Sequence, residues 1–154
     1  DLPGLTHLAL PGTQFTSSGL KHLQTLAGLR ELDLSRTGLT GDDLVHLANL
    51  LGLWELAFDG TNVTGLSRLS VVPTLDTLSL RGTQIDDKSL HDLTALPRLS
   101  ELHLDGTPIT DAGLHGLKVL THLEQLTISN TRVTAAGIAE LQKALPDLKI
   151  DEAE

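Results

Sequence analysis

A leucine pattern that returns about every 24 residues dominates the sequence. Six segments fit L-x-x-L-x-L-x-x-T-x-hydrophobic, with spacings of 24, 24, 22, 24 and 24 residues between their first leucines, at Leu5, Leu29, Leu53, Leu75, Leu99 and Leu123. Self-similarity at a fixed period of this length indicates a repeat architecture, in which each unit buries its apolar face only against its neighbours. The sequence therefore predicts a solenoid of stacked turns.

Each repeat is expected to contain one strand and one short helix. The L-x-L portion alternates with a period of two, as at Leu8 and Leu10, which predicts a short strand with leucine inward. After the threonine, leucines recur at i and i+3, which predicts a short helix with one buried face. Residue types that favour helix N-caps come just before these stripes, at Thr16, Thr40, Asp86, Thr110 and Thr134.

Stacked turns of this kind align their strands into one parallel sheet and place their helices on the other side. Because helices are about 10 Å wide and strands pair at about 4.8 Å, the stack bends with the sheet inside. We expect an α/β fold, a right-handed solenoid with a concave parallel sheet of six or seven strands and short convex helices. The chain forms a single domain in this interpretation, with repeats at about 4–27, 28–51, 52–73, 74–97, 98–121 and 122–146 and a partial seventh turn or cap at 147–154.

The repeat departs from regularity in the third unit and at both ends. The third unit is two residues short, so its convex segment at 65–73 should be a shortened or irregular helix. A seventh strand starts at Leu148, and the pattern breaks at Asp151. The chain opens inside a repeat, where Leu2 matches the helix-end Leu26, as expected of an excised domain or a processed chain. We therefore expect apolar surface at both terminal turns and end-to-end self-association.

Over about residues 2 to 150 this pattern resembles the leucine-rich-repeat family. The T-D-A-G-L helix start at 110–114 is similar to that of ribonuclease-inhibitor-like and F-box-type repeats, and to tandem repeats of bacterial proteins. The family usually has Asn or Cys where this chain has Thr13, Thr37, Thr61, Thr83, Thr107 and Thr131. A threonine hydroxyl makes fewer bonds between turns than an asparagine amide. The resemblance implies protein recognition on the concave face.

Composition narrows the classes of partner. The formal net charge of −9 argues against nucleic acid, because phosphate binding needs clustered Lys and Arg. An acidic chain suits a basic protein partner instead. The absence of cysteine excludes a disulfide framework and a thiolate metal site, and it leaves the compartment open. No apolar run is long enough for a membrane span.

Outward-facing strand positions are the candidate site, because they share one continuous surface. They carry an acidic patch with one arginine and one histidine, and Trp54 lies at its edge as an apolar anchor. The predicted partner-binding residues are Glu31, Asp33, Trp54, Glu55, Asp59, Arg81, Glu101, His103 and Asp105. The alternative is a solvated face that only keeps an exposed sheet soluble.

Two features within this patch have competing interpretations. Asp59, Arg81 and Asp105 occupy one position on three successive turns, which predicts an ion cluster that serves either docking or local charge compensation. Trp54 is either a partner hot spot or a lid packed on the stem of Arg30.

Enzyme chemistry is not expected. Paired carboxylates such as Glu31 and Glu55 would lie on an open face, without the cleft and tuned general acid that a glycosidase needs. The histidines on the helices lie too far apart to share a zinc ion, so neither a metal nor a cofactor is predicted. The leading hypothesis is a protein–protein recognition module. The alternatives are an architectural spacer within a larger multidomain protein and a carbohydrate-binding module.

Overall fold

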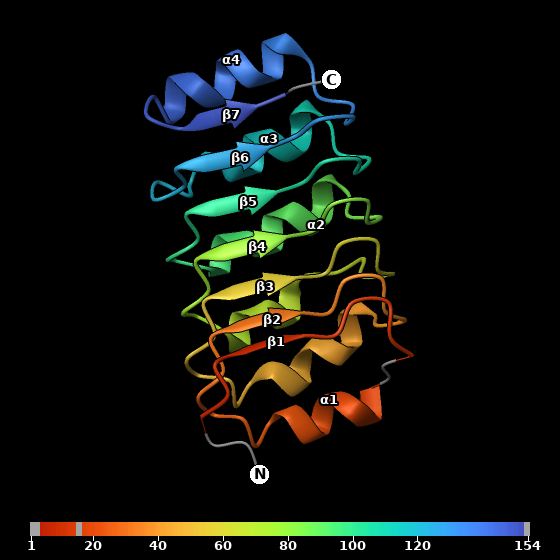
Figure 1. Ribbon diagram of the computed structural model, residues 1–154. Coiled ribbons are helices and arrows are strands. Elements are labelled where there is room, and N and C mark those ends of the chain that lie inside the picture. Colours follow the sequence, from red (N-terminus) through yellow and green to blue (C-terminus); the bar gives the residue numbers. More distant parts are fainter. Residues whose placement is uncertain (1–3, 15–16, 153–154) are drawn as a thin grey trace.

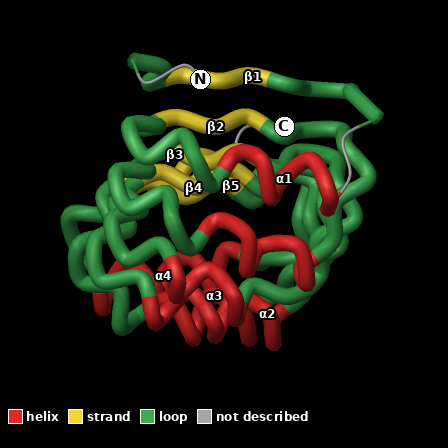
Figure 2. Tube along the Cα trace, turned by 90° about the horizontal axis from the view of Figure 1, so that it is seen from below, coloured by secondary structure: helices red, strands yellow, loops and turns green. Residues whose placement is uncertain are grey.

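The computed structural model describes residues 4–14 and 17–152, which form one solenoid with a sheet on one side and helices on the other (Figures 1 and 2). Seven parallel strands pair in sequence order into a single sheet. The strands are β1 (His7–Ala9), β2 (Glu31–Asp33), β3 (Glu55–Ala57), β4 (Thr77–Ser79), β5 (Glu101–His103), β6 (Gln125–Thr127) and β7 (Lys149–Asp151). The predicted α/β leucine-repeat solenoid is confirmed.

The register of the sheet follows the leucine columns. Equivalent positions of adjacent repeats pair directly, for example Leu32 with Leu56 and Leu56 with Leu78. These leucines point into a continuous core that runs the length of the stack, with Phe58 as its largest fully buried side chain. The prediction that the pattern breaks at Asp151 is wrong by one residue. Asp151 pairs with Thr127, and its carbonyl accepts the Ile128 N–H at 2.9 Å, a backbone contact that any side chain permits.

The other side of the stack holds short helices of two kinds. The α-helices are α1 (Ser17–Leu23), α2 (Asp87–His91), α3 (Asp111–Leu117) and α4 (Ala135–Ala144). The 3₁₀-helices are η1 (Gly41–Leu47), η2 (Ser67–Val71) and η3 (Asp92–Ala95). The same i, i+3 leucine spacing occurs in α3, at Leu114 and Leu117, and in η1, at Leu44 and Leu47, so the spacing is compatible with both helix types. The irregular convex segment predicted at 65–73 is confirmed as η2.

Side chains cap the helices largely where the sequence predicts. Asp86 accepts the Ser89 N–H at the start of α2, and Thr110 and Thr134 accept N–H groups at the starts of α3 and α4. Thr40 acts differently, since its N–H and its hydroxyl both donate to the Asp43 carboxylate. The predictions for Leu2 and Thr16 lie outside the described residues.

Aspartates at helix starts also tie consecutive turns together. The Asp87 carboxylate accepts the N–H and the hydroxyl of Thr110 on the next turn, at 2.7 and 2.6 Å. Asp111 accepts the same two groups from Thr134, at 2.8 and 2.7 Å. Each carboxylate lies against a helix glycine of the following turn, where a Cβ atom would overlap it. These contacts give a physical reason for the aspartate and the glycine at the helix starts, which the repeat period alone did not indicate.

The repeated threonines close each turn on itself. All six hydroxyls donate to the carbonyl three residues earlier at 2.6–2.8 Å, for example Thr83 to Leu80 and Thr107 to Leu104. The expectation that threonine makes fewer bonds between turns than asparagine is consistent with this local geometry. These threonines stabilise the bend after each strand.

The residue directly before each of the six repeated threonines adopts a left-handed backbone conformation. Glycine fills it at Gly12, Gly60, Gly82 and Gly106 with φ of 62° to 68°, whereas Arg36 and Asn130 hold it with φ of 56°. Glycine adopts this conformation without steric cost, and asparagine tolerates it better than arginine. Backbone strain is therefore expected at Arg36.

Arg36→Gly is expected to raise the free energy of unfolding by about 0.5–1 kcal/mol, because it removes the left-handed penalty of a side chain with a Cβ. The N–H of residue 36 still donates to the Asp59 carbonyl. Urea denaturation measures the change. Asn130→Gly is the matched control and should gain less, so an equal gain at both positions would argue against local strain at Arg36.

The two ends of the stack are not equivalent. At the N-terminal end Leu5, Leu8 and Leu10 are only partly buried, as predicted for an uncovered turn. At the C-terminal end Ile150 is likewise only partly buried, but Leu141 and Leu145 are at most 6% exposed, so the predicted apolar surface is found there only in part. The ten-residue helix α4 packs against α3 and buries Ile138 and Leu141, and its exposed residues are alanines together with Glu140, Gln142 and Lys143. Self-association through the N-terminal end stays a prediction.

Candidate functional site

Parallel pairing places the outward residues of the strands in rows across one surface, which we call the sheet face. The first row contains His7, Glu31, Glu55, Thr77, Glu101 and Gln125. The second contains Ala9, Asp33, Ala57, Ser79, His103 and Thr127. The rows thus have the composition that the sequence predicts. The residues within them divide into two groups with different surroundings.

The first group surrounds a shallow hollow over β1 to β3, which we call the acidic hollow. It encloses about 220 Å³ and is lined by His7, Leu8, Ala9, Glu31, Leu32, Asp33, Glu55 and Ala57. The small side chains of Ala9 and Ala57 stand on either side of Asp33 and leave space beside its carboxylate. Asp33 uses one oxygen to accept the Ser35 N–H at 2.9 Å. The hollow therefore presents carboxylates around a space that the protein itself leaves empty of side chains.

Glu55 is the least compensated carboxylate of the hollow. Glu31 has an ion pair with His7, with Nε2 and Oε1 2.8 Å apart, whereas Glu55 makes no ion pair within residues 4–14 and 17–152. Partial burial raises the pKa of Glu55, and the charges of Glu31 and Glu101 raise it further. The ionised form of Glu55 is therefore held against unfavourable electrostatics.

Glu55→Gln is expected to raise the free energy of unfolding at neutral pH by a few tenths of a kcal/mol, because it removes like-charge repulsion between adjacent strands. The gain should shrink as pH falls, since the raised pKa lets wild-type Glu55 take up a proton in the folded state before it does so in the unfolded state. Urea denaturation at several pH values measures both effects. Glu124→Gln, at an exposed position, is the control and should change little.

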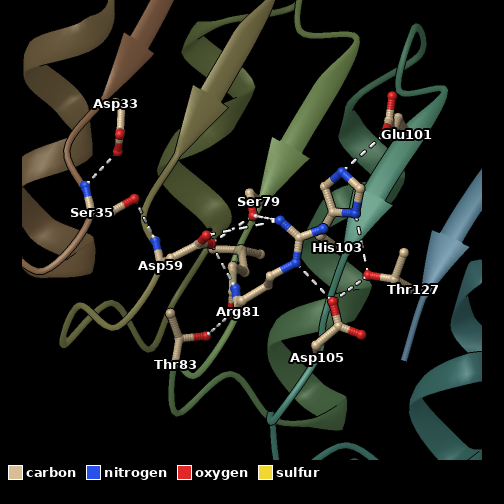
Figure 3. A network of polar contacts seen from close by, with 11 residues as sticks. Asp33, Ser35, Asp59, Ser79, Arg81, Thr83, Glu101, His103, Asp105 and Thr127 are labelled. Atoms are coloured by element: carbon tan, nitrogen blue, oxygen red, sulfur yellow. Dashed lines mark hydrogen bonds and ion pairs between the residues drawn. The ribbon is translucent and has the colours of Figure 1, made fainter. Parts of the chain in front are cut away.

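The second group is a connected set of contacts over β4 to β6, which we call the polar network (Figure 3). Its members are Asp59, Ser79, Arg81, Glu101, His103, Asp105 and Thr127. Arg81 Nε donates to Asp105 Oδ2 at 2.8 Å, and its Nη1 lies 4.0 Å from Asp59 Oδ2. The predicted Asp–Arg–Asp ion cluster is confirmed. Ser79 and Thr127 join it from the second row and were not among the predicted site residues.

Asp105 accepts the largest number of hydrogen bonds in this group. Besides Arg81, it accepts the Thr127 hydroxyl at 2.5 Å and the Ser129 N–H at 2.8 Å. Partial burial raises the pKa of Asp105, but the bonds from Thr127, Arg81 and Ser129 outweigh it, so the pKa lies below its ordinary value. Asp105 is therefore ionised and internally satisfied.

His103 lies between the acidic residues of the network. Its Nε2 is 3.0 Å from Glu101 Oε1 and its Nδ1 is 3.2 Å from Thr127 Oγ1. Burial lowers the pKa of His103, and the nearby Arg81 guanidinium lowers it further, while Glu101 and Asp105 act in the opposite direction. Each carboxylate of the polar network thus has a partner within the chain, whereas Glu55 of the acidic hollow has no ion pair among the described residues.

Trp54 lies at the rim of the sheet face, directly before β3. Its N–H donates to the Arg30 carbonyl, and its own carbonyl accepts N–H groups of Asp76 and Thr77. These backbone bonds fix the chain at the start of three strands, and Trp54 is 38% exposed. Whether the indole serves as a partner hot spot or as a lid on Arg30 stays a prediction.

The carboxylates and histidines of the sheet face raise the question of a metal site. Within the part of the chain that the structure describes, no group of three or more His, Asp or Glu side chains is arranged to hold a metal ion. No described helix is long and apolar enough to cross a membrane. The paired carboxylates of the hollow lie on an open face, as the sequence predicts.

A comparison with protein families matches residues 28–50 to the family described as Leucine Rich Repeat. That segment is one turn of a stack in which every turn repeats the same register. The fold is that of a leucine-rich-repeat solenoid. Repeat solenoids of this kind commonly serve as protein–protein interaction modules, because stacking creates an extended surface. No curated protein matches the chain.

Solved leucine-rich-repeat structures resemble the solenoid over nearly all its length. An internalin from Listeria monocytogenes is 21% identical with a TM-score of 0.76, over 99% of this chain and 49% of that one. Internalin C2 from the same organism is 23% identical with a TM-score of 0.66, over 97% and 71%. A leucine-rich-repeat protein from Leptospira interrogans is 19% identical with a TM-score of 0.63, over 97% and 49%. The solenoid spans about half the length of the first and third of these chains.

Proposed function

We propose that this leucine-rich-repeat solenoid is a protein-recognition module whose partner docks on the sheet face with basic side chains over the acidic hollow. The observation that supports this most is the contrast between the two groups. Charges in the polar network already have partners within the chain, whereas Glu55 in the hollow has a raised pKa and no ion pair among the described residues. A cation in the hollow would relieve that repulsion.

The proposed docking surface contains the residues predicted from the sequence and gives each group of them a different role. Glu31, Asp33 and Glu55 receive the basic groups of the partner. Trp54 contributes apolar contact from the rim. The remaining residues, Asp59, Arg81, Glu101, His103 and Asp105, form a preorganised polar border that matches neutral or weakly basic groups.

The partner is proposed to be a protein and not a nucleic acid, because the solenoid carries a net charge of −9 and its sheet face is acidic. An enzymatic role is not proposed, since the carboxylates lie on an open surface. The two competing functions make different predictions. A spacer predicts that substitutions on the sheet face change nothing but stability, and a carbohydrate-binding module predicts that an uncharged sugar, not a cation, quenches Trp54.

The test uses an oligolysine peptide as the cationic probe and Trp54 fluorescence as the signal, since Trp54 is the sole tryptophan. We expect binding that weakens from low to physiological ionic strength. Glu55→Lys should weaken it about tenfold, which corresponds to the loss of one close charge contact and its replacement by repulsion. Asp42→Lys makes the same change of charge at an exposed position on the helical side and is the matched control.

Equal effects of the two substitutions would show that only net charge matters and would contradict docking on the sheet face. Absence of saturable binding at low ionic strength would contradict the proposal as a whole. Each variant is first compared with the wild type by circular dichroism, so that loss of folding is not mistaken for loss of binding.

A further inference from the structure

The hydrogen atoms around His103 can be counted from the contacts of the polar network. Thr127 has a single hydroxyl proton, and its oxygen lies 2.5 Å from Asp105 Oδ2. A separation this short between a hydroxyl and a carboxylate requires the proton to lie between the two oxygens. The Thr127 oxygen is therefore left as an acceptor towards His103 Nδ1, 3.2 Å away.

The same count extends to the other nitrogen of the ring. Nδ1 must carry a proton to donate to Thr127, and Nε2 must carry one to donate to the Glu101 carboxylate at 3.0 Å. Only the doubly protonated imidazolium has both protons. In the arrangement observed, His103 thus links two carboxylates, Glu101 directly and Asp105 through the Thr127 hydroxyl.

We propose that His103 is a proton-controlled latch that holds Glu101 when the ring is charged and releases it when the ring is neutral. On deprotonation the ring gives up its Nε2 proton and keeps the Nδ1 proton, because Thr127 can only accept. Glu101 then faces a lone pair, and its carboxylate turns away towards solvent. The latch is a property of the network itself, but its effect on a partner rests on the proposed function.

Charged groups from neighbouring turns set when the latch closes. Arg81, which follows β4, faces the ring from one side, and Asp59, which follows β3, lies beyond it. Glu101 and Asp105 belong to the same turn as the ring. Burial and Arg81 keep the pKa of His103 below its ordinary value, so the latch closes at a lower pH than it would with an unperturbed histidine.

Release of Glu101 changes the sheet face in a defined direction. Glu101 shares the first row with Glu31 and Glu55, and its charge already acts on Glu55. Opening the latch removes one positive charge and frees one carboxylate beside the acidic hollow. A cationic ligand should therefore bind about threefold more tightly above the titration of His103 than below it, the change expected for one exposed ion pair.

The decisive experiment needs no partner. Two-bond ¹H–¹⁵N spectra of the folded protein report which ring nitrogen of His103 carries a proton across the pH range in which histidine titrates. We expect the Nδ1–H tautomer in the neutral state and both protons in the acidic state. Exposed His22 on α1 is the internal control and should show the usual mixture of tautomers with Nε2–H in excess.

Two variants test the contacts separately. Thr127→Val removes the acceptor for Nδ1, so the neutral ring should lose its preference for the Nδ1–H tautomer. Glu101→Gln keeps that preference and lowers the pKa of His103, because it removes a carboxylate that favours the charged ring. A neutral ring in the Nε2–H form in the wild type overturns the latch, and so does an unchanged tautomer in a folded Thr127→Val variant. The wild-type spectrum and Glu101→Gln decide the question if Thr127→Val does not fold.

Oligolysine binding separates this inference from the proposed function. Through the titration of His103, affinity should rise about threefold more in the wild type than in His103→Gln, which keeps the His7–Glu31 pair of the hollow. If the ring behaves as expected but oligolysine does not bind, the latch stands and the proposed function fails. If oligolysine binds the wild type and His103→Gln with the same pH profile, the regulatory role of the latch is overturned while the proposed function stands.

Discussion

Gly113→Ala is expected to lower the free energy of unfolding by about 1–3 kcal/mol, the range for a group forced into a well-packed site. A Cβ at this position would lie 2.5 Å from Asp87 Oδ1 and 3.0 Å from the buried Leu90 Cδ1. The aspartate cannot move away without losing its two bonds to Thr110. Urea denaturation followed by circular dichroism measures the loss.

Gly116→Ala is the matched control, since it makes the same substitution in the same helix, α3. Nothing lies within 4 Å of a Cβ at Gly116. Alanine favours a helix over glycine by about 0.8–1 kcal/mol, so this variant should be more stable than the wild type. Opposite signs at positions 113 and 116 would establish the contact with Asp87 as the cause, and a loss of stability at both would contradict it.

Asp105→Ala should lower the free energy of unfolding at neutral pH by about 2 kcal/mol, because it removes charged hydrogen bonds from a side chain that is 22% exposed. Arg81, Thr127 and the Ser129 N–H all lose their acceptor. Asp42→Ala removes an exposed carboxylate from the helical side and should change little. Similar losses in both variants would mean that net charge, and not the network, accounts for the effect.

The effect of Asp105→Ala on stability should also depend on pH in acidic solution. The pKa of Asp105 is lower in the folded protein than its ordinary value of 3.8, so the folded state binds this proton less readily than the unfolded state. The stability contributed by Asp105 is thus complete above pH 3.8 and lost as pH falls through the lower folded value. Wild type and Asp105→Ala should converge in stability over that interval, and a constant difference between them would argue against the assigned contacts.

Much of the fold follows from the sequence because the same leucine positions recur in every repeat. The inward direction of Leu56 is predicted from its own segment and also from five equivalent leucines in the other repeats. The strand register pairs all six of these positions. The choice between α- and 3₁₀-helix was less predictable. Repeats of 24 residues contain α1, η1 and α3, so neither the repeat length nor the leucine stripe specifies the helix type.

The position of the candidate site was predictable from the sequence. Its division into the acidic hollow and the polar network was not. The rows of the sheet face follow directly from the repeat, so Glu55 and Asp105 could both be placed on it. Their difference depends on Thr127 and Ser129, which approach Asp105 from the next turn at distances that only side-chain geometry determines. Threonine and serine carry no charge, so a pattern of charged and aromatic residues does not include them.

The difference in burial between the two ends of the stack predicts an order in which its turns fold and unfold. In a linear array the stability of each turn depends on its two neighbours, so the turn with one incompletely covered side opens most easily. Leu5, Leu8 and Leu10 are partly buried in the turn that contains β1, whereas at the opposite end Ile150 is partly buried but Leu141, Leu145 and Leu148 are buried. Folding should accordingly progress from the α4 end towards β1, and unfolding should reverse that order. The acidic hollow over β1 to β3 then lies in the segment that forms last, so a partner bound there would act as a cap on the whole array.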